Sequence, residues 1–305
     1  MTGTREPLTV PHGIDLSTAA VGRSIGGRIR RLFGRRVALV DRFAFAGVAL
    51  LLLFAAAGPF LAPFSPYEVA PEDALLPPGP GHLLGTDDAG RDVLSRILAG
   101  AGTTLLAAVG IVVLSMITGV LVASVAALLP RWADEAVMRV CDIFMSIPSL
   151  VLALGLAAAI GPSLTSIIIA MVAASWPGTA RLMRGILRET MCGSYVEAAQ
   201  VLGVSRLRLM LRHVLPNSMD AVYVQASMEI SGTIVMMAGL AFLGVGAPPP
   251  SPDWGSLVAQ GQQFITSAWW VALFPGLAIT ISAIAFGLVG DAVRGVVDPA
   301  SRSVR

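Results

Sequence analysis

Lysine is absent from this sequence, because all 21 basic residues among its 305 are arginines. A P-loop needs a lysine to reach the nucleotide phosphates, and a Schiff-base enzyme needs a lysine amine. The chain therefore makes neither site in the usual way. Charged residues are also scarce, at 13% of the chain, whereas soluble domains carry about 25%. Together with 55% hydrophobic residues, this composition indicates a protein of the lipid bilayer.

Cysteine and histidine are rare as well. Cys141 and Cys192 lie in or beside segments that we assign below to the cytoplasm, where thiols stay reduced, so no disulfide is expected. The three histidines, His12, His82 and His213, lack metal-ligand spacing, so no metal site is predicted. None of them falls in an apolar run, which argues against an intramembrane enzyme.

Six apolar runs are long enough to cross the bilayer core, which takes about 20 helical residues. They cover residues 43–61, 103–129, 140–160, 164–180, 221–245 and 269–289. The third run contains Pro148, and a Gly-Pro-Ser turn joins it to the fourth. We therefore predict an all-α integral membrane protein with six transmembrane helices.

The distribution of arginine predicts the orientation. With the N-terminus inside, the four cytoplasmic segments hold 8, 2, 6 and 3 arginines, in the order 1–42, 130–139, 181–220 and 290–305. Only Arg91 and Arg96 are then external. Positive residues gather on the cytoplasmic side of membrane proteins, so both termini are predicted to be cytoplasmic. The first run and its basic flank are too long for a cleaved signal peptide, so we expect it to remain a span.

The same features divide the chain into four parts. Residues 1–36 form a cytoplasmic tail whose composition predicts poor order. Residues 37–98 hold the first helix and an external loop, and residues 99–299 form the main transmembrane domain. The large cytoplasmic loop 181–220 lies within that domain, and residues 300–305 form a C-terminal tail.

The large cytoplasmic loop contains the stretch SYVEAAQVLGVSRLRLMLRHVLPNS, which predicts a helical elbow over residues 194–213. Ser194 and Glu197 have the spacing of a capping box, which predicts the start of a short helix. Gly203 would end that helix, and Ser205 would cap a second helix up to residue 213.

The elbow has two interpretations on physical grounds. Ala198 and Ala199 leave the backbone of the first helix accessible, so this helix would fit a groove on a partner protein. Alternatively, Arg206, Arg208 and Arg212 would hold an amphipathic helix at the lipid surface. The residues alone favour neither interpretation.

The same stretch resembles the EAA signature of ABC importer permeases. The matching residues are Glu197, Ala198, Ala199, Gly203, Leu215 and Pro216, and His213 stands where the peptide-importer branch commonly has histidine. In that family the elbow is the coupling helix that docks in a cleft of the ATPase subunit. The resemblance therefore favours partner docking.

A second stretch, HLLGTDDAGRDVLSRILAGAGTTL at 82–105, resembles the signature of the C-type permease subunit of dipeptide, oligopeptide and nickel importers. The loop motif, as we call its matching residues, comprises Gly85, Thr86, Asp87, Gly90, Arg91 and Asp92. Gly102 departs from the family pattern, which has arginine there, so no contact is carried over from that position. The loop motif is either a self-satisfied turn or a contact for the binding protein or the partner permease.

Glu229 is the clearest ionisable residue within a predicted span, about ten residues into the fifth. Ionisable groups inside membranes are costly and usually functional. Glu229 would either meet a peptide amino group in the pathway or take part in a structural pair within the bundle.

The resemblance, which covers residues 37–299, implies the type I ABC importer permease fold and a multi-pass location in a bacterial cell membrane. The chain would be a non-catalytic subunit that forms half of a pathway for dipeptides or oligopeptides. Its partners would be a paralogous B-type permease, two cytoplasmic ATPases, an extracytoplasmic solute-binding protein, lipid and the peptide, with no nucleic acid. The ATPases would bind ATP and Mg, so no cofactor is expected in this chain.

Two alternatives stay open. In the first, the chain would belong to the same class of importer but carry nickel chelates, haem or glutathione. An ion-coupled secondary transporter would show inverted repeats and paired broken helices, and no such symmetry is visible in the sequence. Uptake that depends on an ion gradient rather than on ATP would favour that class.

Overall fold

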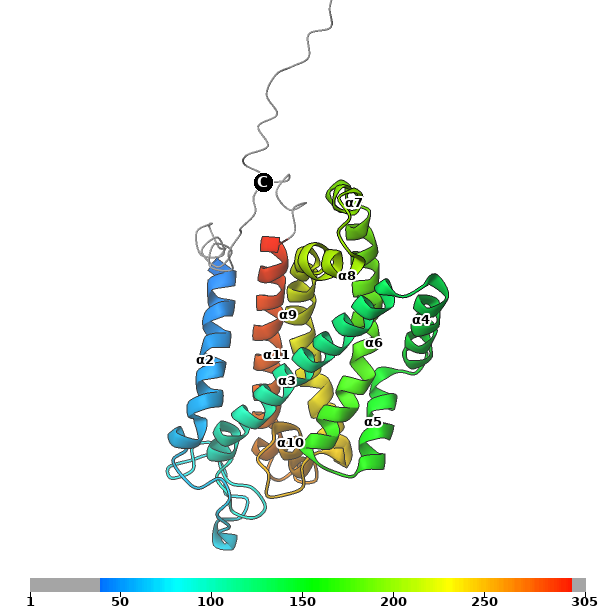
Figure 1. The fold of residues 1–305 in the computed structure, drawn as a ribbon. Coiled ribbons are helices and arrows are strands. Elements are labelled where there is room, and N and C mark those ends of the chain that lie inside the picture. Colours follow the sequence, from blue (N-terminus) through cyan, green and yellow to red (C-terminus); the bar gives the residue numbers. More distant parts are fainter. Residues whose placement is uncertain (1–38, 298–305) are drawn as a thin grey trace, which may run out of the picture. The chain divides into compact units, whose positions relative to one another are not determined.

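The computed structural model describes residues 39–297, and every regular element in that range is a helix (Figure 1). The predicted tails at 1–36 and 300–305 lie outside the described residues. The helices are α2 (Leu39–Leu61), η2 (Pro71–Asp73), α3 (Val93–Leu128), α4 (Arg131–Met145), α5 (Ser149–Ile160), α6 (Leu164–Met191), α7 (Ser194–Val201), α8 (Arg206–Leu209), η3 (Met210–Val214), α9 (Leu215–Leu240), η4 (Ala241–Val245), α10 (Trp254–Gln262) and α11 (Trp270–Val297).

Five helices in the described range are long and apolar enough to cross a membrane, and α4 with α5 makes a sixth span only if the bent pair is counted as one. The predicted third span, which contains Pro148, is this bent pair, in which α4 and α5 meet at 85°. Pro148 supplies the reason: it lacks an amide hydrogen and its ring excludes the preceding helical turn.

The long helices pack in a bundle. α3 lies between α2 and α6, and α11 lies between α2 and α9 (Figure 1). The first residues of α2 and the last residues of α11 lie at the same end of the bundle as α7 and α8, while α10 lies at the other end. The elbow and both ends of the described chain therefore share one side.

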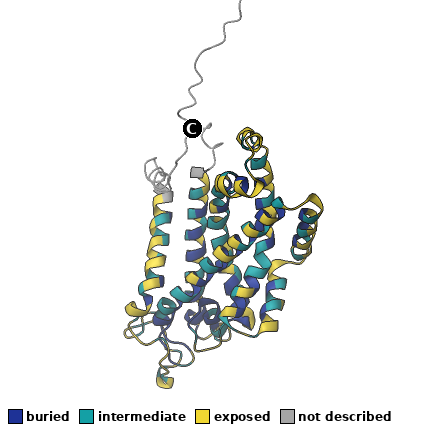
Figure 2. Cartoon of the chain, viewed as in Figure 1, coloured by how far each residue is buried: buried dark blue, intermediate teal, exposed yellow. Residues whose placement is uncertain are grey.

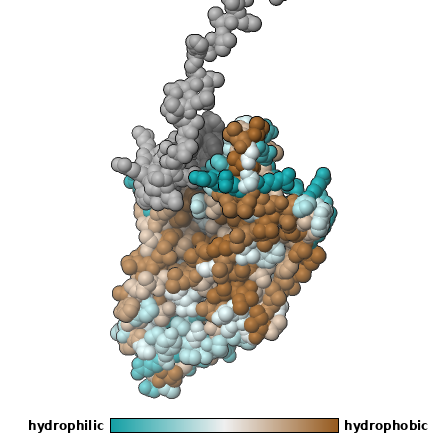
Figure 3. All heavy atoms as spheres, in the orientation of Figure 1, coloured by the Kyte–Doolittle hydropathy of each residue, from teal (hydrophilic) through white to brown (hydrophobic). Residues whose placement is uncertain are grey.

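The surface of the bundle fits a bilayer. Figure 2 shows buried residues along the inner helix faces and exposed residues along the outer ones. On the face seen in Figure 3, an apolar band lies between two more hydrophilic ends. Large apolar side chains of the long helices, such as Leu53, Val113 and Ile281, are about half exposed in the described chain. Soluble monomers rarely expose such large contiguous apolar areas, so this band is the lipid-facing surface.

Candidate functional site

The first helix of the elbow, α7, is fixed to the bundle by one side chain. Val196 is fully buried, and it joins a cluster with Met183 and Leu187 of α6. Leu209 and Val214, from beyond the turn, belong to the same cluster. The elbow is thus packed onto both α6 and the start of the next long helix.

The turn after α7 depends on Gly203, whose φ is +78°. The Gly203 amide donates to the Gln200 carbonyl oxygen at 2.9 Å, and the Val204 amide donates to the Ala199 carbonyl oxygen at 3.1 Å. This pair of bonds is a Schellman motif, in which the left-handed position is usually glycine. The prediction that Gly203 ends the first helix is confirmed.

The predicted capping box is wrong. Gly193 is the N-cap of α7, and Ser194 is its first helical residue, without a side-chain cap hydrogen bond. A Cβ on residue 193 would lie 2.8 Å from Cε1 of Tyr195, so a larger residue there would displace the half-exposed Tyr195 side chain. The backbone of this glycine takes the cap position that the sequence pattern assigned to Ser194.

The second helix of the elbow also differs from the prediction. α8 ends at Leu209 and continues through the π-helical η3 into α9, and the Ser205 side chain makes no cap hydrogen bond. Pro216 cannot donate a backbone hydrogen bond and its ring crowds the preceding turn. The wider π turn accommodates it. The second helix of the elbow and the fifth span therefore form one continuous helical run, Arg206–Val245, with a kink at Gly244.

The outward face of α7 is exposed. Val201 and Leu202 are 87% and 83% exposed, and Figure 3 shows apolar atoms at this tip, beyond a row of hydrophilic residues. Glu197 and Ala198 are exposed too, and the Glu197 carboxylate has no hydrogen-bond or ion-pair partner among the described residues. An apolar tip beside a free carboxylate can enter a groove that offers apolar contacts and a donor.

The remaining signature residues lie farther along. Ala199 belongs to α7 and is half-buried, packed against the same cluster as Val196. The other three, His213, Leu215 and Pro216, lie at the junction of η3 and α9. The His213 carbonyl accepts a hydrogen bond from the Asn217 side chain at 2.6 Å. The structure therefore brings Glu197, Ala198 and Gly203 onto the exposed elbow and places the other residues at its base.

Asp87 is the centre of the loop motif at the opposite end of the bundle. Its carboxylate is 1% exposed and accepts hydrogen bonds from the amides of Ala89 and Arg91, both at 2.9 Å. It also pairs with the guanidinium of Arg91 at 2.8 Å and with that of Arg96. One buried carboxylate thus holds two arginines, and among the described residues only the Nε of Arg96 is left without a hydrogen-bond partner in this network.

The other loop-motif residues are also used internally. Asp92 caps α3 by accepting from the Ser95 amide at 2.8 Å, and the Thr86 carbonyl accepts from Trp270. Gly85 and Gly90 have positive φ, and a Cβ at position 90 would lie 1.8 Å from a carbonyl oxygen. The structure therefore supports the self-satisfied interpretation of this turn.

Sequence reasoning missed the connection from this loop to α10. Arg96 is 1% exposed and donates to the Gln260 side chain at 3.2 Å. Trp254, at the start of α10, donates from Nε1 to the Ile97 carbonyl at 2.9 Å. The available signal was Arg96 itself, a charge that sits beside an apolar run and must be compensated.

Glu229 lies in α9, half-buried, and accepts a hydrogen bond from Gln225 at 2.6 Å, one helical turn earlier. The structure does not bring it near the elbow or the loop motif. Its contact with a substrate stays a prediction.

Within residues 39–297, no group of three His, Cys, Asp or Glu side chains is placed to hold a metal ion.

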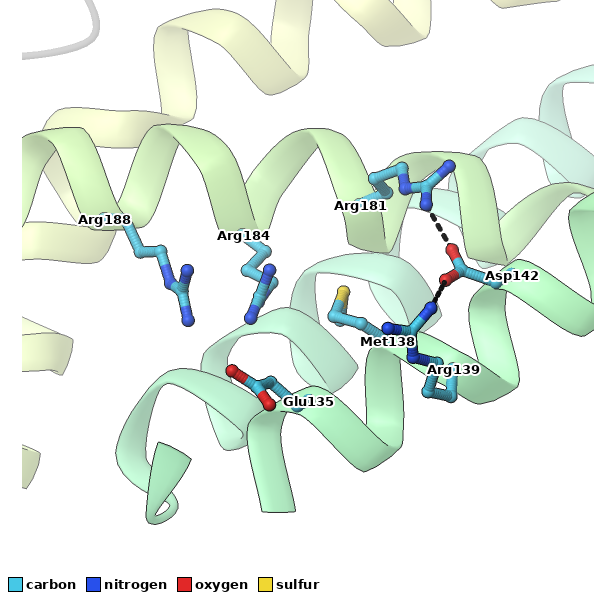
Figure 4. A pocket seen from close by; sticks show the side chains of 7 residues that line it. All are labelled: Glu135, Met138, Arg139, Asp142, Arg181, Arg184 and Arg188. Carbon is cyan, nitrogen blue, oxygen red and sulfur yellow. Dashed lines mark hydrogen bonds and ion pairs between the residues drawn. The ribbon is translucent and has the colours of Figure 1, made fainter. Parts of the chain in front are cut away.

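A second missed feature joins α4 to α6. Asp134 is 4% exposed and accepts two hydrogen bonds from Arg184, at 2.6 and 2.5 Å, as well as one from Arg188. Asp142 pairs with Arg181 and Arg139 (Figure 4). The signal in the sequence was the spacing of the α6 arginines by three and four residues, which places them on one helix face.

Comparison with known proteins identifies the family. Residues 115–303 match the family described as the inner membrane component of binding-protein-dependent transport systems. The chain belongs to this family. Residues 27–78 of the permease also match the N-terminal transmembrane domain of oligopeptide transport permease C. The predictions of a membrane location and of an ABC importer permease are confirmed.

Curated relatives cover most of the permease. A putative peptide transport system permease protein of Brucella suis is 42% identical over 88% of this chain and 90% of its own length. The dipeptide transport system permease protein DppC of Escherichia coli is 42% identical over 83% of this chain and 86% of its own. The probable D,D-dipeptide permease protein DdpC of the same species is 40% identical over 83% and 85%.

Solved structures show the same fold. One of the inward-facing structures of the MetNI methionine ABC transporter matches with a TM-score of 0.53 at 18% identity, covering 66% of this permease and 96% of that chain. The prediction of the type I ABC importer permease fold is confirmed.

Proposed function

We propose that this permease forms half of the pathway of an ATP-driven importer for dipeptides or oligopeptides, and that the elbow contacts an ATPase subunit. The observation that supports this proposal most is the exposed face of the elbow. There Glu197, which has no partner among residues 39–297, and the apolar Val201 and Leu202 extend from a packed base. The names of relatives at 40 to 42% identity support a peptide substrate.

The proposal assigns the remaining tasks to partners. A second, paralogous permease would complete the pathway, and a solute-binding protein would deliver the peptide. Two ATPase subunits would bind ATP and Mg and carry out hydrolysis, leaving this subunit non-catalytic. Leu39 and Val297, the first and last described residues, would lie on the cytoplasmic side, since the start of α2 and the end of α11 share the elbow's side and that side would face the ATPases.

The function is tested by reconstituting the complete complex in liposomes with its binding protein and measuring uptake of labelled dipeptides. Uptake should require hydrolysable ATP and should survive an ionophore. ATP-independent uptake that the ionophore abolishes would instead establish an ion-coupled transporter. A parallel series with nickel chelates, haem and glutathione tests the substrate class.

The orientation is tested by thiol labelling of sealed cells. A Ser65→Cys variant should react with an impermeant reagent from outside, because Ser65 is exposed at the end of the bundle opposite the elbow. Cys192, which is exposed beside the elbow, should react only after the membrane is opened. Labelling of Cys192 in sealed cells would reverse the assigned orientation.

Glu229 is tested separately. If it lies on the peptide pathway, Glu229→Gln should lower uptake while assembly is kept. Gln225→Ala is the matched variant, because it removes only the intrahelical hydrogen bond to Glu229. Equal uptake by Glu229→Gln and the wild type would leave Glu229 a structural residue of α9.

A further inference from the structure

Between α4 and α6 there is a cavity of about 360 Å³. Its charged lining is formed by Arg139, Arg181, Arg184, Arg188, Glu135 and Asp142. Figure 4 shows the α6 arginines on the side of that helix that faces α4. The cavity therefore presents several guanidinium groups to one small space.

Two of these arginines keep donors available. Each guanidinium has five N–H donors. Within the described residues, the Arg188 guanidinium bonds only Asp134, and that of Arg139 makes a single long bond of 3.5 Å to Asp142. Asp134 is already held by both ends of Arg184. An anion can therefore bind Arg139 or Arg188, which lie at opposite ends of the cavity in Figure 4, without breaking the contacts that hold α4 to α6.

The charge balance selects the kind of anion. The four arginines face Glu135 and Asp142 in the lining, and Asp134 lies directly behind them. Glu135 also pairs with Arg131, from outside the lining, at 3.1 Å. With Arg131 counted, five arginines stand against three carboxylates, an excess of two. A phosphodiester, which carries one negative charge, offsets part of this excess, and arginine's planar fork suits phosphate oxygens.

An apolar stripe lies on the same helix as the cavity. Trp132, Val140 and Ile143 of α4 are 74%, 45% and 64% exposed, and their spacing places them on one side of the helix. α6 leads directly into α7, so the cavity lies toward the elbow end of the bundle (Figure 1). Tryptophan is typical of the boundary between acyl chains and headgroups.

We propose that this cavity binds the phosphate of an anionic phospholipid whose acyl chains lie along the α4 stripe. Basic pockets between transmembrane helices are known sites for such headgroups. Free phosphate would satisfy the arginines but would leave the apolar stripe without a ligand, so the lipid accounts for both features. The inference depends on the membrane location of the chain and not on the transported substrate.

The test compares lipid retention by the purified full-length chain in detergent, measured by native mass spectrometry with phosphatidylglycerol or phosphatidylcholine. The variant is Arg139→Gln with Arg188→Gln, which leaves Asp142 with Arg181 and Asp134 with Arg184. The matched control, Arg42→Gln with Arg294→Gln, removes the same charge from exposed arginines of α2 and α11, outside the cavity lining. Each arginine contributes about 1 kcal/mol to the binding of an anionic lipid. The Arg139→Gln with Arg188→Gln variant should therefore bind phosphatidylglycerol roughly thirtyfold more weakly than the wild type.

Three outcomes would overturn the proposal. Equal retention of phosphatidylglycerol by the two double variants would show that the cavity is not the site. Equal retention of phosphatidylcholine and phosphatidylglycerol by the wild type would remove the role of charge. Displacement of the lipid by millimolar inorganic phosphate would identify a free-anion site. A fourth measurement covers a protein ligand: loss of ATPase co-purification in the Arg139/Arg188 variant, with its lipid retention unchanged, would also overturn the proposal.

Discussion

The loop motif and the elbow use their charged residues in opposite ways. At one end of the bundle, Asp87 is buried and surrounded by donors from its own chain. At the other end, Glu197 is exposed, and the described residues offer it no partner. Both stretches match signatures of one transporter family, so family resemblance alone does not distinguish a structural residue from a docking residue.

The two carboxylates differ in what they bond to: Asp87 bonds to groups of its own chain, and Glu197 is exposed to solvent. A buried carboxylate must be paired where it stands, because an uncompensated buried charge is strongly destabilising. An exposed carboxylate is solvated by water and remains available to another molecule. Changes in the loop motif should therefore act on folding, and changes in the elbow should act on assembly and coupling.

The largest effect is expected for Asp87→Asn. This change leaves the buried Arg96 without an ion-pair partner and Arg91 with only Asp88 at 3.8 Å, so stability should fall by about 3–5 kcal/mol. Melting of the purified chain in detergent measures the loss. Asp88→Asn is the control, because the Asp88 side chain is 43% exposed and lies 3.8 Å from Arg91. If both variants melt like the wild type, the loop motif does not stabilise the fold.

Gly203→Val should break the elbow without breaking the bundle. A β-branched residue in the left-handed region costs about 1–3 kcal/mol, which is enough to reorganise the turn. Uptake by the assembled complex should fall about tenfold or more while the chain remains inserted in the membrane. ATP hydrolysis should continue without matching uptake.

The matched variant at this position is Gly203→Asn. Asparagine tolerates the left-handed region, and no atom lies within 4 Å of the added Cβ, so most uptake should remain. If Gly203→Val also transports normally, the elbow does not transmit the motion, and the interpretation as a helix on the lipid surface would replace it.

Glu197→Gln should weaken binding of the ATPase and leave melting unchanged. A hydrogen bond to a charged group contributes about 1.5–3 kcal/mol, so affinity should fall roughly tenfold to hundredfold. Glu189→Gln at the end of α6 is the control, with the same loss of charge at another exposed position. Titration of the permease complex with ATPase subunits measures the difference, and equal affinities would remove Glu197 from the contact.

The smallest effect is expected for Ser194→Ala. Because this side chain makes no cap hydrogen bond, stability should change by less than about 0.5 kcal/mol. Thermal melting of the complex provides the comparison. A loss near 1 kcal/mol would mean that the capping box forms after all.

Much of the fold was predictable because long apolar runs have few alternatives in a membrane. The left-handed turn at Gly203 was predictable too, because few residues other than glycine adopt it at low cost. The N-cap was misplaced because Gly193 and Ser194 are both acceptable cap residues. A side chain at position 193 would crowd the Tyr195 ring, and a sequence does not display that proximity.

The internal use of Asp87 was one of two expectations, and its partners Arg91 and Arg96 lie only four and nine residues away. The pairing of Asp134 with the α6 arginines could not be predicted, because Arg184 and Arg188 lie on another helix, 50 and 54 residues along the chain. A sequence displays charges but does not display which of them are buried together. The break at Pro148 was visible, but the 85° angle depends on how α4 packs against α6.

The helix that begins at Arg206 continues through the π turn and past Pro216 as far as the kink at Gly244, whose φ is +89°. Its roughly 38 residues would extend about 57 Å at the usual rise of about 1.5 Å per residue. A rigid rod of that length that pivots by about 5° about one end sweeps its other end through about 5 Å, which is close to the diameter of a small side chain. Had the chain broken at Pro216, a hinge there would absorb that rotation locally. If an ATPase pushes on the elbow, as proposed, the continuous rod would carry that push across the bundle as a displacement large enough to open or close a passage.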